Sequence, residues 1–259
     1  MTDRIIVRKE GPVGWLIFNN PERRNAISVD MWQAIPSVLS QYESDPQVRV
    51  IVLAGAGDKA FVSGADISQF EKERSSADAV QRYEELAEGA AARLQGCDKP
   101  QIAMIRGYCL GGGMNIAVLC DLRIAADDAR FGIPAAKMGL GYRASSMKNL
   151  ADVVGAAYAR EIMITARQFT ATEAREMGLV NKVVSVAELE KTVAEYTQTI
   201  SGNAPLTMRT AKRIIREISA VQYDAAKCKA WAKECFESED YKEGRKAFME
   251  KRKPVFKGK

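Results

Sequence analysis

The sequence of 259 residues contains no histidine. This absence excludes Ser–His–Asp and Cys–His catalysis, any histidine base, and the usual histidine-rich zinc sites. Acid–base chemistry must therefore come from Asp, Glu, Tyr, Lys or Cys side chains, or from bound water.

Closely spaced cysteine pairs and long hydrophobic runs are absent as well. None of the five cysteines belongs to a C-x-x-C pair, and Cys109 and Cys120 lie in apolar surroundings that are typical of buried thiols. This usage fits a reducing compartment. No apolar run reaches about 18 residues, and the first ten residues lack the apolar core of a signal peptide. We therefore expect a cytoplasmic protein that does not enter a membrane.

A strong excess of charge of one sign is also missing. The 38 basic and 33 acidic residues leave a formal charge of +5, which suits a mixed, solvated surface. Such a charge is compatible with an anionic ligand but is too small to indicate nucleic acid. No platform of interleaved aromatic and basic residues is evident either, so we expect no nucleic-acid partner. The 47% of hydrophobic residues can form a sizeable core in one or two domains.

The most informative stretch lies at residues 99–122. A short apolar strand at 102–105 is predicted to end at Gly107, and Gly111, Gly112 and Gly113 precede an apolar helix at 114–120. Three glycines before a helix leave backbone N–H groups exposed, and the helix dipole favours negative charge there. The stretch therefore suits an anion or an oxyanion. The alternative is a tight strand–helix turn without a ligand.

Strands alternate with helices along most of the chain. We predict strands at 4–9, 13–18, 48–53, 61–62, 102–105, 122–126 and 130–133. Helices are predicted from Ser28, as N-cap, to about 42, with a kink at Pro36, and at 75–94, 147–154 and 156–164, with a loop at 138–146. Three further helices are predicted at 206–218, 223–237 and 239–251. This order indicates an α/β fold with a helical C-terminal subdomain.

The glycine stretch resembles a known family signature. The pattern I-A-x-I-x-G-x-x-x-G-G-G-x-x-x-x-V-x-C-D-L, from residue 102, is similar to that of the crotonase superfamily, the enoyl-CoA hydratase/isomerase-like proteins. The segment A-F-V-S-G-A-D-I at 60–67 resembles the first thioester loop of that family. The resemblance implies a crotonase-like spiral of strand–strand–helix units. It also implies an acyl-CoA-binding core at 1–200, a trimerisation subdomain at 201–259, and a homo-oligomer that is a trimer or a dimer of trimers.

The same resemblance implies the site residues. The N–H groups of Ala65 and Gly112 would bind the thioester carbonyl of an acyl-CoA and stabilise the enolate that forms from it. Coenzyme A would enter as part of the substrate, with no separate cofactor and no metal. The positions that would contact substrate or CoA are Arg23, Arg24, Ala26, Ala65, Asp66, Ile67, Ser68, Gly112, Ala135, Phe248 and Lys251. Of these, Phe248 and Lys251 would cover the CoA of a neighbouring subunit. The alternatives are that the two loops are simple turns, that Arg23 and Arg24 are merely exposed, and that the basic C-terminal segment is merely solvated.

Two positions depart from the family pattern. Asn115 stands where typical hydratases carry their first glutamate, in G-G-G-x-E, and Ala135 stands where they carry the second, in F-G-x-P-E. Hydration needs a base to activate water and an acid to protonate carbon, each typically worth ~10² to 10⁴ in rate. Asparagine holds a water but cannot take its proton, and alanine does neither. Asn115 is expected either to face the acyl group or to bond an N–H of its own helix.

The polar groups that remain near the predicted pocket are Lys137, Tyr142, Arg143, Ser145 and Ser146, and they suggest a different reaction. The run G-L-G-Y-R-A-S-S-M-K-N-L at 139–150 resembles the corresponding loop of methylmalonyl-CoA decarboxylases of the superfamily, where a tyrosine occupies the place of Tyr142. Loss of CO₂ generates the enolate without a base, so Tyr142 would hydrogen-bond the carboxylate and Arg143 would pair with it. Alternatively, Tyr142 packs over the loop and Arg143 is solvated. Asp66 and Asp121 are expected to hold loops rather than to transfer protons.

From sequence, the protein is thus expected to be an enoyl-CoA hydratase/isomerase-family enzyme that stabilises a thioester enolate without the two usual glutamates. One alternative is a methylmalonyl-CoA-type decarboxylase that uses Tyr142. The other is a non-catalytic homologue that binds CoA or RNA.

Overall fold

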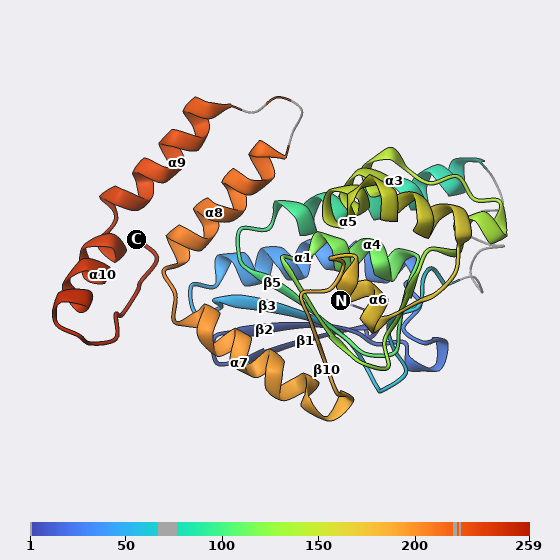
Figure 1. Ribbon diagram of the computed structural model, residues 1–259, viewed down its shortest axis with the longest axis horizontal. Coiled ribbons are helices and arrows are strands. Elements are labelled where there is room, and N and C mark those ends of the chain that lie inside the picture. The colour runs from blue at the N-terminus through green and yellow to red at the C-terminus, as the bar shows by residue number, and fades with distance from the viewer. Residues whose placement is uncertain (1, 67–76, 220–221, 223) are drawn as a thin grey trace.

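The computed structural model describes residues 2–66, 77–219, 222 and 224–259 (Figure 1). Its larger sheet has six strands in the order β1-β2-β3-β5-β7-β10. They are β1 (Ile5–Glu10), β2 (Val13–Phe18), β3 (Val50–Gly55), β5 (Gln101–Ile105), β7 (Leu122–Ala126) and β10 (Lys182–Val184). β1 and β2 form the predicted antiparallel hairpin, and the remaining pairs of the sheet are parallel.

A second, smaller sheet has the order β4-β6-β8-β9. Its strands are β4 (Ala60–Val62), β6 (Tyr108–Leu110), β8 (Arg130–Gly132) and β9 (Phe169–Thr170). The pairs β4–β6 and β6–β8 are parallel, and β8–β9 is antiparallel. Because carboxyl ends of parallel strands lie at the same edge of a sheet, the segments that leave β4 and β6 begin side by side.

The predicted spiral is confirmed as a repeated strand–strand–helix unit. In each unit a strand of the larger sheet is followed by a strand of the smaller sheet and then by a helix. The units are β3-β4-α3, β5-β6-α4 and β7-β8-α5, with α3 at Ala77–Gly96, α4 at Gly112–Leu119 and α5 at Ala144–Thr165. Two sheets with separate helices therefore arise from one local pattern, and each repeat adds one strand to both sheets.

The central strand β3 of the larger sheet is buried on both faces, as its β-branched sequence predicts. One face packs into the main core with α1 (Val29–Ser44), where Phe18 and Phe61 meet edge to face at 5.7 Å between ring centroids. On the other face, Leu189 and Val193 of α7 (Leu189–Ser201) join the cluster of Val50, Val52 and Ile102 (Figure 1). Burial of both faces accounts for the unbroken apolar run of β3.

Most predicted helices are confirmed, with shifted ends. Ser28 precedes α1 as its N-cap, and the helix continues past Pro36 to Ser44. α5 begins at Ala144, so the loop predicted to extend to 146 ends earlier, and the predicted division into two helices falls at Gly155, with φ of 74°. A short helix, α6 (Ala171–Glu176), follows its N-cap Thr170, whose Oγ1 accepts from the Glu173 N–H at 3.2 Å.

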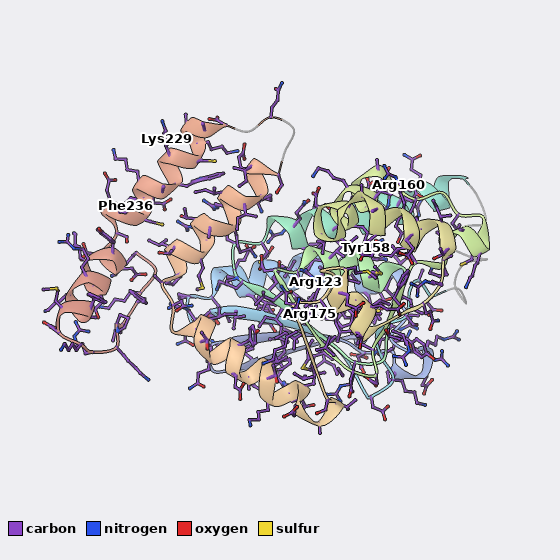
Figure 2. All side chains as sticks on the ribbon, viewed as in Figure 1. Arg123, Tyr158, Arg160, Arg175, Lys229 and Phe236 are labelled. Atoms are coloured by element: carbon purple, nitrogen blue, oxygen red, sulfur yellow. The ribbon has the colours of Figure 1, made fainter. Side chains whose placement is uncertain are left out.

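A buried arginine ties three segments of the core together. The Arg123 guanidinium, on β7, donates from Nε to the Leu179 carbonyl and from Nη1 to the Cys120 carbonyl, both at 2.6 Å, and from Nη1 to the Ala117 carbonyl at 3.3 Å (Figure 2). Only 6% of this residue is exposed. The three carbonyls compensate for the removal of its charge from water.

The last three helices form an arm beside the two sheets. They are α8 (Pro205–Ile218), α9 (Ala225–Glu237) and α10 (Glu239–Met249), and Figure 1 shows α9 and α10 well separated from α3 and α5. α8 is attached to the core by Lys212, whose Nζ lies 2.6 Å from the Asp121 carboxylate. Large apolar side chains remain exposed on the arm, among them Phe236 (Figure 2) and Phe248. Within the described ranges, no helix has the length and apolar character needed to cross a bilayer.

Candidate active site

A cavity of about 250 Å³ lies where the segments after β4 and β6 meet α3 and the 3₁₀ turn Pro134–Met138. Its lining includes the sequence-predicted residues Ala65, Gly112, Asn115, Ala135, Tyr142 and Arg143. These residues come from four separate segments of the chain. Apolar and aromatic side chains complete the wall, namely Trp32, Tyr83, Ala87, Ile133, Met138 and Leu140.

The close approach of α4 to β4 holds the two glycine loops together. A Cβ atom on Gly113 would lie 2.1 Å from the Val62 carbonyl oxygen, so only glycine allows the helix to begin there without displacement. Gly111 has φ of +50°, and a Cβ on it would lie 3.7 Å from the Gly64 Cα. The backbones of the two loops therefore lie side by side.

Ala65 and Gly112 each present a backbone N–H beside this contact. Ile27 donates to the Gly64 carbonyl at 2.8 Å and Asp66 donates to the Ile27 carbonyl at 2.9 Å, a parallel pattern in which the N–H of Ala65 points away from Ile27. Gly112 is the first residue of α4, where an N–H has no acceptor within the helix. In the described part of the chain, neither N–H donates to a protein acceptor.

Asn115 and Tyr142 form the polar pair of the cavity. Asn115 lies in the first turn of α4 and lines the cavity, so it faces the predicted acyl position. Burial raises the pKa of Tyr142 to about 12, and the hydrogen bond to the Asn115 side chain opposes that rise without cancelling it. Tyr142 is therefore neutral near neutral pH and is available as a hydrogen-bond donor.

The described residues that line this cavity include no carboxylate. Ala135 is 4% exposed and offers only a methyl group. The Arg143 side chain is partly exposed, at 28%, and it is also bonded to α3: its Nη1 donates to the Glu84 carbonyl at 2.9 Å and lies 3.8 Å from the Glu88 carboxylate. The arginine thus fastens the Tyr142 loop to α3.

Two aromatic residues of the wall were not singled out from sequence. Trp32 Nε1 donates to the Tyr83 hydroxyl at 3.0 Å, and both residues are less than a tenth exposed. Tyr83 was predicted only as part of the apolar face of a helix. That pattern identifies a buried face but does not distinguish a filled core from the wall of a cavity.

The positions predicted to contact CoA have mixed locations. Asp66 is buried and lies 3.6 Å from Arg23 Nη1 and 3.9 Å from Arg4 Nη1, so it orders its loop through ion pairs. Arg24 stacks over the Tyr108 ring at 4.7 Å, and Ala26 is buried. Ile67 and Ser68 lie outside the described residues.

Asn25, which sequence reasoning missed, holds the segment that contains Arg23 and Arg24 to the β3–β4 connection. It has φ of 55° and is fully buried. Its Nδ2 donates to the carbonyls of Ala56 and Ala60 at 2.9 and 2.8 Å. The signal available was an asparagine between a polar loop and an apolar run, a residue type that tolerates the left-handed conformation.

Four other predicted residues do not line the cavity. Asp121 accepts from the Gln101 N–H at 2.7 Å and pairs with Lys212, so it joins β5 to α8. Lys137 is exposed. Phe248, on α10, is 83% exposed, and Lys251 follows the end of that helix with φ of 53°. Among the described residues, no group of three or more His, Cys, Asp or Glu side chains is arranged to hold a metal ion.

Comparison with known proteins gives consistent matches over the whole chain. A family model described as enoyl-CoA hydratase/isomerase matches residues 8–259. The chain is 37% identical over 254 residues to the short-chain-enoyl-CoA hydratase of Clostridium acetobutylicum, covering 97% of this chain and 96% of that protein. It is 32% identical over 267 residues to the carnitinyl-CoA dehydratase of Escherichia coli K12, covering both chains fully. A crystal structure of an enoyl-CoA hydratase/carnithine racemase from Magnetospirillum magneticum superposes with a TM-score of 0.94 at 33% identity, covering 100% of this chain and 97% of that one.

Proposed function

Because the chain belongs to the enoyl-CoA hydratase/isomerase family, we propose that it binds an acyl-CoA thioester and stabilises its enolate with the N–H groups of Ala65 and Gly112. Both N–H groups lie beside one cavity and lack protein acceptors in the described part of the chain, which supports this role. Removal of one such donor typically costs ~10² to 10³ in rate. Coenzyme A enters as part of the substrate, without a further cofactor.

The observation that carries the choice of reaction is a cavity that combines these donors with a Tyr–Asn pair and, among its described lining residues, no carboxylate. Asn115 and Ala135 cannot supply the base and acid of two-glutamate hydration. A reaction that creates the enolate without a protein base is therefore favoured over hydration.

Decarboxylation of a malonyl-type thioester satisfies this condition. The bond between the α-carbon and the carboxylate breaks, its electron pair moves to the thioester carbonyl as an enolate, and CO₂ leaves. The neutral Tyr142 hydroxyl, held by Asn115, donates a hydrogen bond to the departing carboxylate. A proton from solvent then restores the α-carbon. Arg143 keeps the loop in place through α3, because its guanidinium is already bonded there.

The remaining expectations concern CoA and assembly, and they belong to the same proposal. Arg23 and Arg24, beside the Asp66 loop, would contact the phosphates of CoA as charge-assisted partners. The arm at 201–259 would form a homotrimer or a dimer of trimers and bring Phe248 and Lys251 over the CoA of a neighbour. The exposed Phe248 supports burial of the arm in an assembly. We place the protein in the cytoplasm.

The decisive experiment is to incubate the purified protein separately with crotonyl-CoA, methylmalonyl-CoA and malonyl-CoA and to identify the products by mass. Loss of CO₂ from a malonyl-type thioester, with crotonyl-CoA unchanged, is the expected result. Rapid hydration of crotonyl-CoA would overturn the argument from Asn115 and Ala135 and direct attention to Asp66 as a base. Binding of all three without turnover would identify a non-catalytic homologue.

Tyr142→Phe tests the tyrosine itself. A hydrogen bond to a charged group is worth roughly 1.5–3 kcal/mol, so decarboxylation should slow by about tenfold to a hundredfold. Tyr158→Phe, at an exposed tyrosine of α5 (Figure 2), is the matched control and should retain full activity. Because the pKa of Tyr142 is about 12, the rate should also show no fall near pH 10, where an ordinary tyrosine ionises. Unchanged turnover of Tyr142→Phe would exclude the role.

A further inference from the structure

A second cavity adjoins the first between α3, α4 and α5. Its volume is about 270 Å³, and it shares Trp32, Ala87, Asn115 and Arg143 with the thioester cavity. Small-molecule pockets usually measure ~300 to 1,000 Å³, so either chamber alone is small for a ligand, whereas the two together fall within that range. Four shared wall residues indicate that one ligand can extend from the first chamber into the second.

The second chamber differs chemically from the first. Its floor is apolar, with Ile116, Val118 and Leu119 of α4. Outside the wall that it shares with the first cavity, its polar lining residues are Glu88 and Gln95 of α3 and Ser145, Ser146 and Asn149 of α5. We call the four neutral residues of this set its far side. Gln95 Nε2 donates to Asn149 Oδ1 at 3.3 Å, so these two amides face each other across the gap between α3 and α5.

An unbroken alkyl chain does not suit this chamber. It would pack well on the floor, but at the far side it would separate amides and hydroxyls from water without replacing their hydrogen bonds. The chamber does not favour a charged end group either. The opposite charges of Arg143 and Glu88, which lie 3.8 Å apart at its border with the first cavity, offset each other. The lining fits a chain that is apolar near the thioester and ends in a neutral hydrogen-bonding group.

We propose that the second chamber receives the distal part of the acyl group and selects acyl-CoA thioesters whose chain ends in a neutral polar group, such as a hydroxyl. This inference rests on the proposed acyl-CoA function and specifies its substrate class. Gln95 and Asn149 would exchange their mutual hydrogen bond for hydrogen bonds to the end group. Ile116 and Leu119 would contact the methylene groups.

The test compares octanoyl-CoA with ω-hydroxyoctanoyl-CoA by titration calorimetry. Neither saturated thioester has a double bond to hydrate or a malonyl carboxylate to lose, so affinity is measured apart from turnover. One or two additional hydrogen bonds should make the hydroxylated thioester bind about threefold to tenfold more tightly. Equal binding, or tighter binding of octanoyl-CoA, would overturn the inference while leaving acyl-CoA binding intact. Failure of both to bind would overturn the proposed function and this inference with it.

A double variant assigns the preference to the far side of the chamber. Gln95→Leu combined with Asn149→Leu removes both amides and should abolish or reverse the preference for the hydroxylated chain. Gln198→Leu, at an exposed glutamine of α7 outside both cavities, is the matched control and should retain it. Melting temperatures of the three proteins verify that all are folded. A double variant that is folded and keeps the full preference would refute the assignment.

Discussion

Gly113→Ala should disturb the protein far more than the same change at the adjacent Gly112. A Cβ on Gly113 would lie 2.1 Å from the Val62 carbonyl oxygen and 2.8 Å from the Val62 Cβ, well inside the closest contacts that real Cβ atoms make. Both neighbouring atoms belong to a buried strand, so relief requires α4 to move by about 1 Å away from β4.

The expected cost follows from two opposing effects. Forced overpacking typically costs ~1 to 3 kcal/mol, whereas replacing glycine by alanine in a helix gains up to about 1 kcal/mol. We therefore expect Gly113→Ala to lower the free energy of unfolding by about 2 kcal/mol and the melting temperature by roughly 4–8 °C. A Cβ on Gly112 would meet its nearest atoms at an ordinary 3.8 Å, so Gly112→Ala should melt close to the unaltered protein.

Activity should separate the two variants as well. A shift of α4 by about 1 Å would move the Gly112 N–H relative to that of Ala65, and such misplacement can cost ~10² in rate. The assay is calorimetric melting of both variants, followed by turnover of the active thioester well below the melting temperature. If Gly113→Ala melted and turned over like the unaltered protein, the close approach of α4 and β4 would not set the geometry of the site.

Three further predictions concern the core. Arg123→Leu should reduce the free energy of unfolding by about 3 kcal/mol or more in urea denaturation, because three buried carbonyls lose their donor, whereas Arg160→Leu at an exposed position of α5 should have little effect. Burial raises the pKa of three thiols, Cys97, Cys109 and Cys120, to about 12 for Cys97 and Cys120. These three cysteines should therefore resist iodoacetamide in the folded protein, whereas Cys228 and Cys235 should react, and mass spectrometry would show the difference. Stability should also fall as pH rises above about 9, since the unfolded chain then releases thiol protons that the folded chain retains; a constant melting temperature from pH 8 to 10 would contradict this.

The sequence predicts the long elements of this fold because their patterns are local. The run at 48–53 has no polar residue except one arginine, and it forms β3, which is covered by α1 on one side and α7 on the other. The strand β6 was missed. It has only three residues between two glycine segments, and it exists because β4 and β8 pair with it on either side. Such pairing depends on contacts between distant residues and leaves no periodic signal.

The same distinction applies to the cavity. Ala65, Gly112, Asn115 and Ala135 were predicted together because the resemblance to the crotonase signature assigns them to one site, and all four line the cavity. The hydrogen bond that links Arg143 to α3 joins residues 59 positions apart in the sequence, so no local sequence pattern predicts it. The wall formed by aromatic side chains was likewise invisible, because an apolar helix face looks the same whether it packs on a core or on a cavity.

The chemistry that remains possible here is governed by what the backbone supplies. The N–H groups of Ala65 and Gly112 do not depend on side-chain identity, so the enolate stabilisation that we propose for them would survive any substitution that preserves the loops. Proton transfer does depend on side chains, and the described residues that line the cavity include no carboxylate. A cavity with the proposed enolate-binding N–H groups and, among its described lining residues, no carboxylate suits a substrate whose own bond cleavage produces the enolate. Asn115→Glu examines this reasoning directly: a carboxylate beside Tyr142 should repel a malonyl-type carboxylate and slow its decarboxylation, and unchanged or faster decarboxylation would contradict the placement of that carboxylate beside Tyr142 and Asn115.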